Sequence, residues 1–265
     1  HKKRLFPFLF LKIKQKTIFL DFGEGSQRAL TKISSTIIIP DYIFISHYHL
    51  DHYHGLYPYL KTLEMIGVTK KIKIFIPENQ GMRLFERELL LLNLNIELII
   101  GNSQFIQEGL SLSFFKTIHT RESRGVIIRT EQRRTYLKTT IEKRKGPLLS
   151  KLKNEGNLIY EGIKYTYSEN TEVVEPSLSL AYTSDTSPLK NSPLVDFLIH
   201  ECTYVTGQED TAIQKKHTAL SQITNTLKGY KKVFLVHLHP KHNKYPELPV
   251  GFYWPAPYEK IDLNL

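Results

Sequence analysis

Residues 46–56 read Ser-His-Tyr-His-Leu-Asp-His-Tyr-His-Gly-Leu and hold four of the eleven histidines of the chain. Imidazole and carboxylate side chains at such close spacing are typical of a transition-metal site. The pattern His-x-His-x-Asp-His is made by His47, His49, Asp51 and His52. We predict that these four side chains bind metal. His54 fits no ligand pattern and is expected to be a partly exposed helix residue.

The spacing within this stretch predicts two metal positions. His47 and His49 would alternate onto one side of a loop that follows a strand. Asp51 and His52 would begin a helix and face a second position nearby. Four protein ligands cannot saturate two ions, so further ligands have to come from other parts of the chain.

Short apolar runs rich in β-branched residues predict strands at residues 16–22, 41–47, 72–78, 96–101, 112–119, 125–131, 178–185, 196–201 and 232–239. Helical spacing predicts helices at residues 25–33, 55–66, 79–92 and 217–228. The mixture indicates an α/β or α+β fold.

Reactive side chains lie at the C-terminal ends of five of these runs, where sheet proteins gather their ligands. They are His47, His119, Asp185, His200 with Glu201, and His237. His119, Asp185 and His237 are therefore the candidates for the missing metal ligands, with the aspartate able to bridge two ions. His239 follows His237 on the same strand face, and spacing alone leaves these two histidines open.

The bulk composition suits a single large domain over residues 1–265, since 41% of the residues are hydrophobic. A single cysteine, Cys202, excludes an internal disulfide framework and favours a reducing, cytoplasmic setting. No apolar run approaches the roughly 20 residues of a membrane helix. The run at residues 5–13 is too short to span a bilayer, so we expect no membrane association.

The formal net charge of +10 is concentrated in one segment. Residues 129–153 hold nine basic and two acidic side chains, a surplus of seven positive charges. Such a surplus favours a polyanionic partner. We expect residues 130–176 to form a flexible arm inserted into the domain.

Several stretches resemble known proteins. The His-x-His-x-Asp-His pattern followed by glycine is the hallmark of the metallo-β-lactamase fold. Further stretches, in the same order, resemble ribonuclease Z, the tRNA 3′-processing endoribonuclease of that superfamily: FLDFGEGSQRAL (19–30), GPLLSKLKNEG (146–156), YTSDTSP (182–188), IHECTY (199–204), KHTALSQI (216–223) and LVHLHPKH (235–242). The resemblance implies an αββα four-layer sandwich with a protruding basic arm.

The resemblance also implies roles for individual residues. One metal would be held by His47, His49 and His119, the other by Asp51, His52 and His237, with Asp185 bridging both. The alignment selects His237 over His239. Glu201 and His217 would supply the proton to the leaving group, and Asp51 would orient or deprotonate the nucleophile. Asp21 and Glu24 would support the metals from beneath.

The implied activity is removal of the 3′ trailer from precursor tRNA, which leaves a 3′-hydroxyl on the tRNA and a 5′-phosphate on the trailer. The implied cofactors are two divalent ions per chain, zinc in the first place and manganese or iron otherwise, and the implied assembly is a homodimer. Substrate contacts are expected from Lys143, Arg144, Lys145, Gly146, Pro147 and Lys241. The alternative is a small-molecule phosphodiesterase or lactonase of the same superfamily.

The chain departs from the ribonuclease Z pattern at its start, where that family has a further strand. An absent strand would leave an edge of the sheet exposed. Lys241 also stands where the family carries an arginine, which replaces a two-pronged phosphate contact with a point charge.

Overall fold

The computed structural model describes residues 7–78, 81–101, 104–136, 146–175, 177–227, 229–242 and 244–263. The chain forms two compact units, which we call the body (residues up to 128 and 179–263) and the arm (129–178). Lys143, Arg144 and Lys145, which we expected to contact substrate, lie outside the described residues.

The first sheet of the body is mostly parallel. Its strands, in spatial order, are β1 (Leu9–Ile13), β2 (Lys16–Leu20), β3 (Tyr42–Phe44), β4 (Ile72–Ile76) and β5 (Ile96–Ile100). Parallel neighbours need a crossover, and helices supply it. The crossover helices are α1 (Ser26–Ile33), α3 (Leu56–Met65) and α4 (Met82–Leu90). Strands β2 to β5 and these three helices lie where the sequence predicted them.

Strand β1 was not predicted from the sequence. It pairs antiparallel with β2 and occupies the edge of the sheet. The two strands are joined at Lys14 and Gln15, whose φ values of 48° and 62° match a two-residue hairpin turn. This strand lies in the apolar run at residues 5–13, which is too short to span a bilayer. Among the described helices, none has the length and apolar composition needed to cross a bilayer.

The second sheet of the body contains seven strands. In spatial order they are β16 (Phe252–Tyr253), β15 (Lys232–Val236), β14 (Phe197–Glu201), β13 (Leu178–Tyr182), β8 (Ser123–Thr130), β7 (Leu110–Thr117) and β6 (Gln104–Gln107). β13, β14, β15 and β16 run parallel. Helices α7 (Glu209–Lys215) and α8 (Leu220–Thr226) lie between β14 and β15 in the chain.

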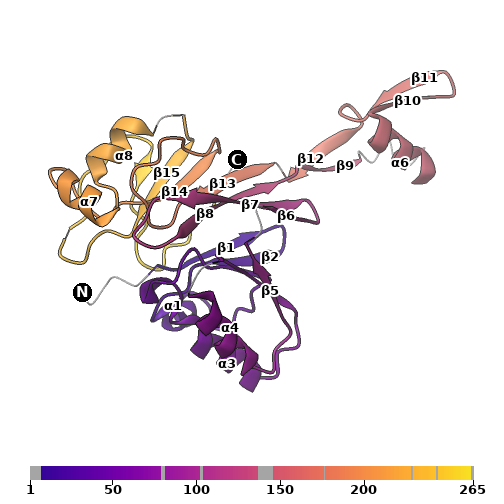
Figure 1. Cartoon of the computed structure of the whole chain (residues 1–265). Helices are drawn as coiled ribbons and strands as arrows, with labels where there is room; N and C mark the ends of the chain where they lie inside the picture. Colours follow the sequence, from indigo (N-terminus) through magenta and orange to yellow (C-terminus); the bar gives the residue numbers. More distant parts are fainter. Residues whose placement is uncertain are drawn as a thin grey trace. The chain divides into compact units, whose positions relative to one another are not determined.

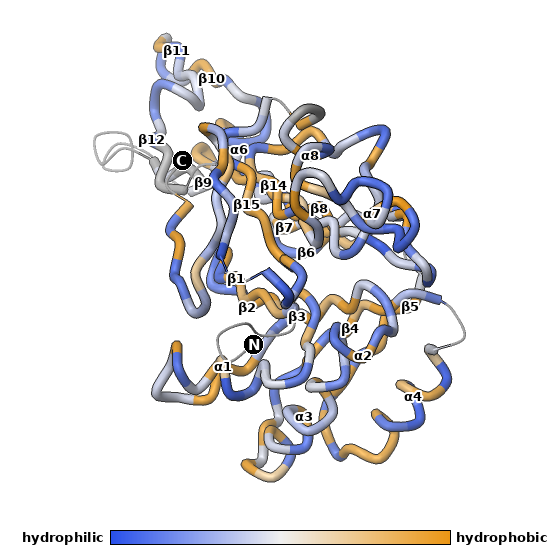
Figure 2. Tube along the Cα trace, turned by 90° about the vertical axis from the view of Figure 1, so that its left-hand side faces the viewer, coloured by the Kyte–Doolittle hydropathy of each residue, from blue (hydrophilic) through white to orange (hydrophobic). Residues whose placement is uncertain are grey.

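The two sheets pack face to face with helices on their outer sides (Figure 1). Between the sheets, Phe44 of β3 stacks on Phe114 of β7 with ring centroids 5.5 Å apart. One core joins the first sheet to its helices through buried side chains such as Phe19, Leu60 and Phe85. A second core joins β13, β14 and β15 to α8. The hydrophobic colouring along β14 and β15 in Figure 2 marks this second core, and the body is thus an αββα sandwich.

The described part of the arm contains two antiparallel strand pairs and one helix. β9 (Arg133–Tyr136) pairs with β12 (Thr171–Glu175), and β10 (Asn157–Tyr160) pairs with β11 (Ile163–Thr166). Helix α6 (Gly146–Glu155) begins at the Gly-Pro step. Gly146 and Pro147, which we expected to contact substrate, form the first turn of this helix, a position that suits proline because no intrahelical donor is needed there.

Candidate metal centre

The carboxyl ends of the strands deliver the predicted site residues to one edge of the body. His47, His49 and the short helix α2 (Leu50–Tyr53), with Asp51 and His52, come after β3. His119 follows β7, Asp185 follows β13, and His237 follows β15. All seven predicted metal ligands fall into two groups whose donor atoms lie within 4.8 Å of one another inside each group.

The first group, which we call the imidazole set, consists of His47, His49 and His119. The Nε2 atom of His47 lies 2.9 Å from Nδ1 of His49, and that Nδ1 lies 3.1 Å from Nε2 of His119. Asp185 Oδ2 lies 3.7 Å from His119 Nε2 and completes the group.

The far nitrogens of the imidazole set fix its tautomers. His119 Nδ1 donates to the carbonyl oxygen of Lys216 at 3.0 Å. His47 Nδ1 lies 2.9 Å from the hydroxyl of Ser46, whose own proton goes to Asp21 at 2.8 Å. His47 and His119 therefore both direct a lone pair at His49. A single proton on His49 can satisfy only one of them, so the set is built to share a cation.

The second group, which we call the carboxylate set, consists of Asp51, His52 and His237. Asp51 Oδ2 lies 3.7 Å from His52 Nε2 and 3.5 Å from His237 Nε2. Asp185 reaches this set too, because its Oδ2 lies 3.3 Å from His52 Nε2 and its Oδ1 lies 3.6 Å from His237 Nδ1. Asp185 thus contacts both sets.

A buried carboxylate holds His52 in place. Asp21 is fully buried, and His52 Nδ1 donates to its Oδ2 at 2.7 Å. Tyr182 and Ser46 also donate to Asp21, at 2.7 and 2.8 Å. A histidine that donates one ring nitrogen to a carboxylate presents the other as a metal ligand. His52 Nε2 is buried and has no hydrogen-bond partner among the described residues.

The two sets differ in protonation. Burial lowers the pKa of His47 well below its ordinary value, the pKa of His49 to about 4, and the pKa of His119. Burial acts in the same direction on His52 and His237, but the neighbouring carboxylates outweigh it and raise both pKa values. Without metal, the imidazole set is neutral at pH 7 and the carboxylate set holds protons.

Three site residues have an uncommon backbone conformation, which sets the direction of their side chains. Asp21, Ser184 and His237 have φ values of 55°, 53° and 64°, in the left-handed region that non-glycine residues seldom occupy. Asp21 and His237 directly follow the last residues of β2 and β15. Such conformations gather at functional sites. The reversal at His237 breaks the alternation of the strand.

A histidine–carboxylate pair lies beside the two metal-ligand groups. Glu201, at the end of β14, is fully buried and accepts a hydrogen bond from Nδ1 of His217 at 2.8 Å. It also accepts from the Thr203 backbone and hydroxyl at 2.9 and 2.8 Å. The Thr203 hydroxyl then accepts from His237 Nδ1 at 2.9 Å. His217 also forms a third candidate metal group with Asp185 and His237, with donor atoms within 4.8 Å of one another.

Other predicted residues lie away from the ligand groups. His239 is not in any candidate group and stacks on Tyr204, and His54 is exposed. His200 is buried and bonds to the Glu201 carbonyl. The resemblance placed Glu24 beneath the metals, which is wrong: Glu24 is exposed, in the turn before α1. Lys241 is exposed, and its backbone N–H donates to His239 Nδ1.

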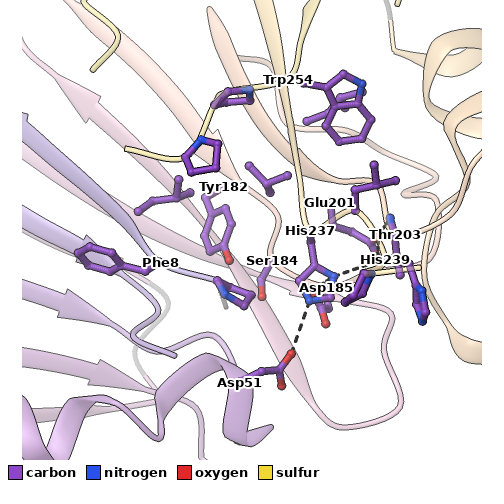
Figure 3. A pocket seen from close by; sticks show the side chains of 18 of the residues that line it. Phe8, Asp51, Tyr182, Ser184, Asp185, Glu201, Thr203, His237, His239 and Trp254 are labelled. Carbon is purple, nitrogen blue, oxygen red and sulfur yellow. Dashed lines mark hydrogen bonds and ion pairs between the residues drawn. The ribbon is translucent and has the colours of Figure 1, made fainter. Parts of the chain in front are cut away.

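A pocket of about 740 Å³ is lined by members of both ligand groups and by the Glu201–His217 pair. The ligand-group members that line it are His49, Asp51, His119, Asp185 and His237. Figure 3 shows Asp51 facing His237, with Ser184 and Asp185 beside them and Trp254 on the far wall. This volume is typical of small-ligand pockets. The donors also fit divalent metal, because lone pairs converge in one set and an orphaned buried nitrogen meets two carboxylates in the other.

The sequence missed the residues that hold these ligands. Tyr182, Ser46 and Ser184 surround Asp21, and Thr203 links Glu201 to His237. Their only signal in the sequence is that each lies within three residues of a predicted site residue.

Comparisons with known proteins agree with this fold. The chain is 24% identical to ribonuclease Z of Archaeoglobus fulgidus over 253 residues, which is 90% of this chain and 83% of that protein. The human short-form tRNase Z superposes with a TM-score of 0.67 at 17% identity, covering 100% of this chain and 95% of that one. A metallo-β-lactamase fold protein of Bacillus subtilis gives 0.61 at 17% identity, covering 89% and 80%.

The resemblance to ribonuclease Z is thereby confirmed, and the body has the metallo-β-lactamase fold. The family model described as "Anti-Pycsar protein Apyc1" matches residues 7–174, more than half of the sequence. The chain belongs to the Anti-Pycsar protein Apyc1 family.

Proposed function

We propose that the protein is a metal-dependent endoribonuclease that removes the 3′ trailer from precursor tRNA and leaves a 3′-hydroxyl on the tRNA and a 5′-phosphate on the trailer. One observation carries the proposal: two convergent donor sets share Asp185 and open into the same pocket as the Glu201–His217 pair. Ribonuclease Z relatives that align over about 90% of the chain support it.

The imidazole set would hold one divalent ion and the carboxylate set the other, with Asp185 shared. Two such ions, zinc before manganese or iron, would lower the pKa of a water molecule and offset the charge that builds on an attacked phosphate. Asp51 would take up the proton of the nucleophile. Burial raises its pKa, but the hydrogen bond with His237 and the charge of His52 outweigh burial, so its pKa is lowered and the carboxylate is ionised at pH 7.

The leaving 3′-oxygen needs a proton, and His217 would give it. Glu201 holds His217 Nδ1 at 2.8 Å, and the half-buried ring lines the pocket. The carboxylate is itself fixed by Thr186 and Thr203. A positioned general acid of this kind contributes about 100-fold or more to a rate.

RNA binding would rely on charge away from the cut. A folded polyanion is bound largely by neutralising its phosphates. The basic segment at residues 129–153 suits this task. Lys143, Arg144 and Lys145, Gly146 and Pro147 at the start of α6, and Lys241 in the body remain the proposed contacts. The proposal includes a homodimer and a cytoplasmic setting, which Cys202, buried and free, suits.

A second candidate function is hydrolysis of a small phosphodiester. The 740 Å³ pocket favours it, because a hollow of this size can enclose a whole small ligand. The chemistry at the metal ligands would be the same. The two candidates differ in whether the basic arm matters.

The test uses a precursor tRNA with a 3′ trailer and the small diester bis(p-nitrophenyl) phosphate. Wild-type protein should cut the precursor and leave the stated ends, and Asp51→Ala should lower the rate at least about 100-fold. Replacing Lys143, Arg144 and Lys145 by glutamine should weaken only precursor cleavage, steeply with salt. The matched control replaces Lys61, Lys70 and Lys71, three body lysines, by glutamine.

Wild-type protein that hydrolyses the small diester but leaves the precursor intact would refute the ribonuclease proposal and establish the second candidate. Unchanged precursor cleavage by Asp51→Ala would refute the assigned chemistry.

A further inference from the structure

An aromatic pair outside the ligand groups lines the same pocket. Tyr204 follows β14, and its ring stacks on His239 with centroids 5.8 Å apart and planes inclined by 21°. The same Tyr204 ring meets His217 edge to face, with centroids 6.1 Å apart. All three side chains line the pocket. Figure 3 shows His239 close to His237 and Thr203.

The backbone ties this pair to the candidate proton donor. Tyr204 N–H donates to the Thr218 carbonyl at 3.2 Å, and Leu220 N–H donates to the Tyr204 carbonyl at 2.9 Å. Tyr204 therefore forms a bridge with the segment that directly follows His217. His239 N–H donates to the Thr203 carbonyl at 2.9 Å. Backbone hydrogen bonds thus hold the two rings next to His217.

We propose that Tyr204, backed by His239, is a substrate-binding residue that stacks the base of the nucleotide on the 5′ side of the cut. The inference rests on the proposed function and names the part of the substrate that this wall takes. Aromatic rings beside phosphodiester chains bind bases by stacking, whatever the base. The nucleotide whose 3′-oxygen receives the proton would lie against His217. Three described rings contact His217, and two of them, His119 and His237, are predicted metal ligands, so Tyr204 is the one that remains to stack a base.

Nearby charge fits the same ligand. Lys215 lines the pocket at the end of α7, and Lys216 directly precedes His217. Lys241 N–H donates to His239 Nδ1 at 3.2 Å, which leaves the His239 Nε2 edge as the donor. An aromatic face with cations around it suits a base joined to phosphate.

The test compares substrates with and without that base. One pair is the dinucleoside monophosphate ApU and its analogue without adenine; the other is the precursor tRNA with and without the base of its last tRNA nucleotide. Tyr204→Leu should lower kcat/KM about tenfold or more on the base-bearing substrates. Tyr204→Phe, which keeps the ring, should stay near wild type. On the abasic substrates Tyr204→Leu should match wild type.

Tyr245→Leu is the matched control, since Tyr245 lines the same pocket but stacks on Trp254. Metal content should be unchanged in every variant, which separates stacking from loss of the fold. An equal loss on base-bearing and abasic substrates would overturn the inference, as would a loss that follows the trailer base.

The experiment distinguishes a failure of the proposed function from a failure of the inference about Tyr204. If wild-type protein cuts ApU but not the precursor, the ribonuclease proposal falls while the ApU pair still decides on Tyr204. If it cuts neither base-bearing substrate, the inference is overturned with the proposal.

Discussion

The imidazole set and the carboxylate set meet at Asp185 but differ in what surrounds their nitrogens. Neutral partners, the Ser46 hydroxyl and the Lys216 carbonyl, bond the far nitrogens of the imidazole set. A buried carboxylate, Asp21, bonds the far nitrogen of His52 in the carboxylate set. Burial therefore lowers the pKa values on one side, whereas charge raises them on the other.

The difference teaches that one chain can build two candidate metal-ligand sets with opposite relations to protons. A metal entering the imidazole set meets lone pairs that are already free. A metal entering the carboxylate set has to displace protons that the carboxylates have attracted. The carboxylate set offers a metal ion more negative charge, but protons compete with the metal for its donor atoms.

Loss of Asp185 should have the largest effect, because it should weaken metal binding at both sets. Asp185 contacts both sets and is almost fully buried. Asp185→Ala should leave both positions with weakened binding, so metal per chain should fall toward zero and cleavage should drop at least about 100-fold. Elemental analysis and the precursor assay measure this. Retention of two ions per chain would show that Asp185 is not shared.

Proton release should separate the two sets at pH 7. His237→Ala keeps the imidazole set, whose pKa values lie below 6.5, so zinc binding should release almost no protons. His119→Ala keeps the carboxylate set, where His52 and His237 both have raised pKa values, so zinc binding should release at least about one proton per ion. Calorimetry in buffers of different ionisation enthalpy measures the release.

The direction in which zinc affinity changes with pH follows from the direction of each pKa shift. Above pH 6.5 and below the raised pKa of His52, the carboxylate set should bind zinc about tenfold more tightly for each unit of rising pH. The imidazole set should show no such dependence there, since it is already neutral. Equal proton release by the two variants would contradict the assignment.

Much of this site followed from sequence because its ligands come after strands. The crowded His-x-His-x-Asp-His motif can be recognised from the sequence alone. His119 and Asp185 come at the ends of apolar runs that form strands in the structure. The choice between His237 and His239 did not follow from spacing, because alternation treats both residues alike. The positive φ of His237 breaks that alternation, and no local pattern announces it.

The supporting residues were harder to predict for a different reason. Tyr182 lies 161 positions from Asp21, and only the packing of the two sheets brings its hydroxyl to the carboxylate. Strand β1 was missed because its apolar run carries no alternation of polar residues. Hydrogen bonds across the layers of a sandwich depend on the whole fold rather than on any one stretch.

Tyr182→Phe should have the smallest effect on metal binding among these variants, and it should distinguish the carboxylate set from the imidazole set. The variant removes the 2.7 Å hydrogen bond to Asp21 and keeps the buried ring in place. Asp21 then holds His52 with one donor fewer, while Ser46 still donates to it twice. Groups that orient metal ligands are worth about 10–100-fold in affinity, and a partial loss should lie at the lower end, about tenfold.

The decrease should be confined to the carboxylate set, so one of the two zinc affinities should fall while the other is unchanged. Tyr59→Phe is the control, because it removes a buried hydroxyl that donates to the Ile38 carbonyl on the helical side of the first sheet. Both variants should lose similar stability in urea, since each loses one buried hydrogen bond. Only Tyr182→Phe should change zinc binding. A matching change in both zinc affinities would mean that Asp21 supports the two sets equally, through Ser46 as well as His52, and that the sets are one unit.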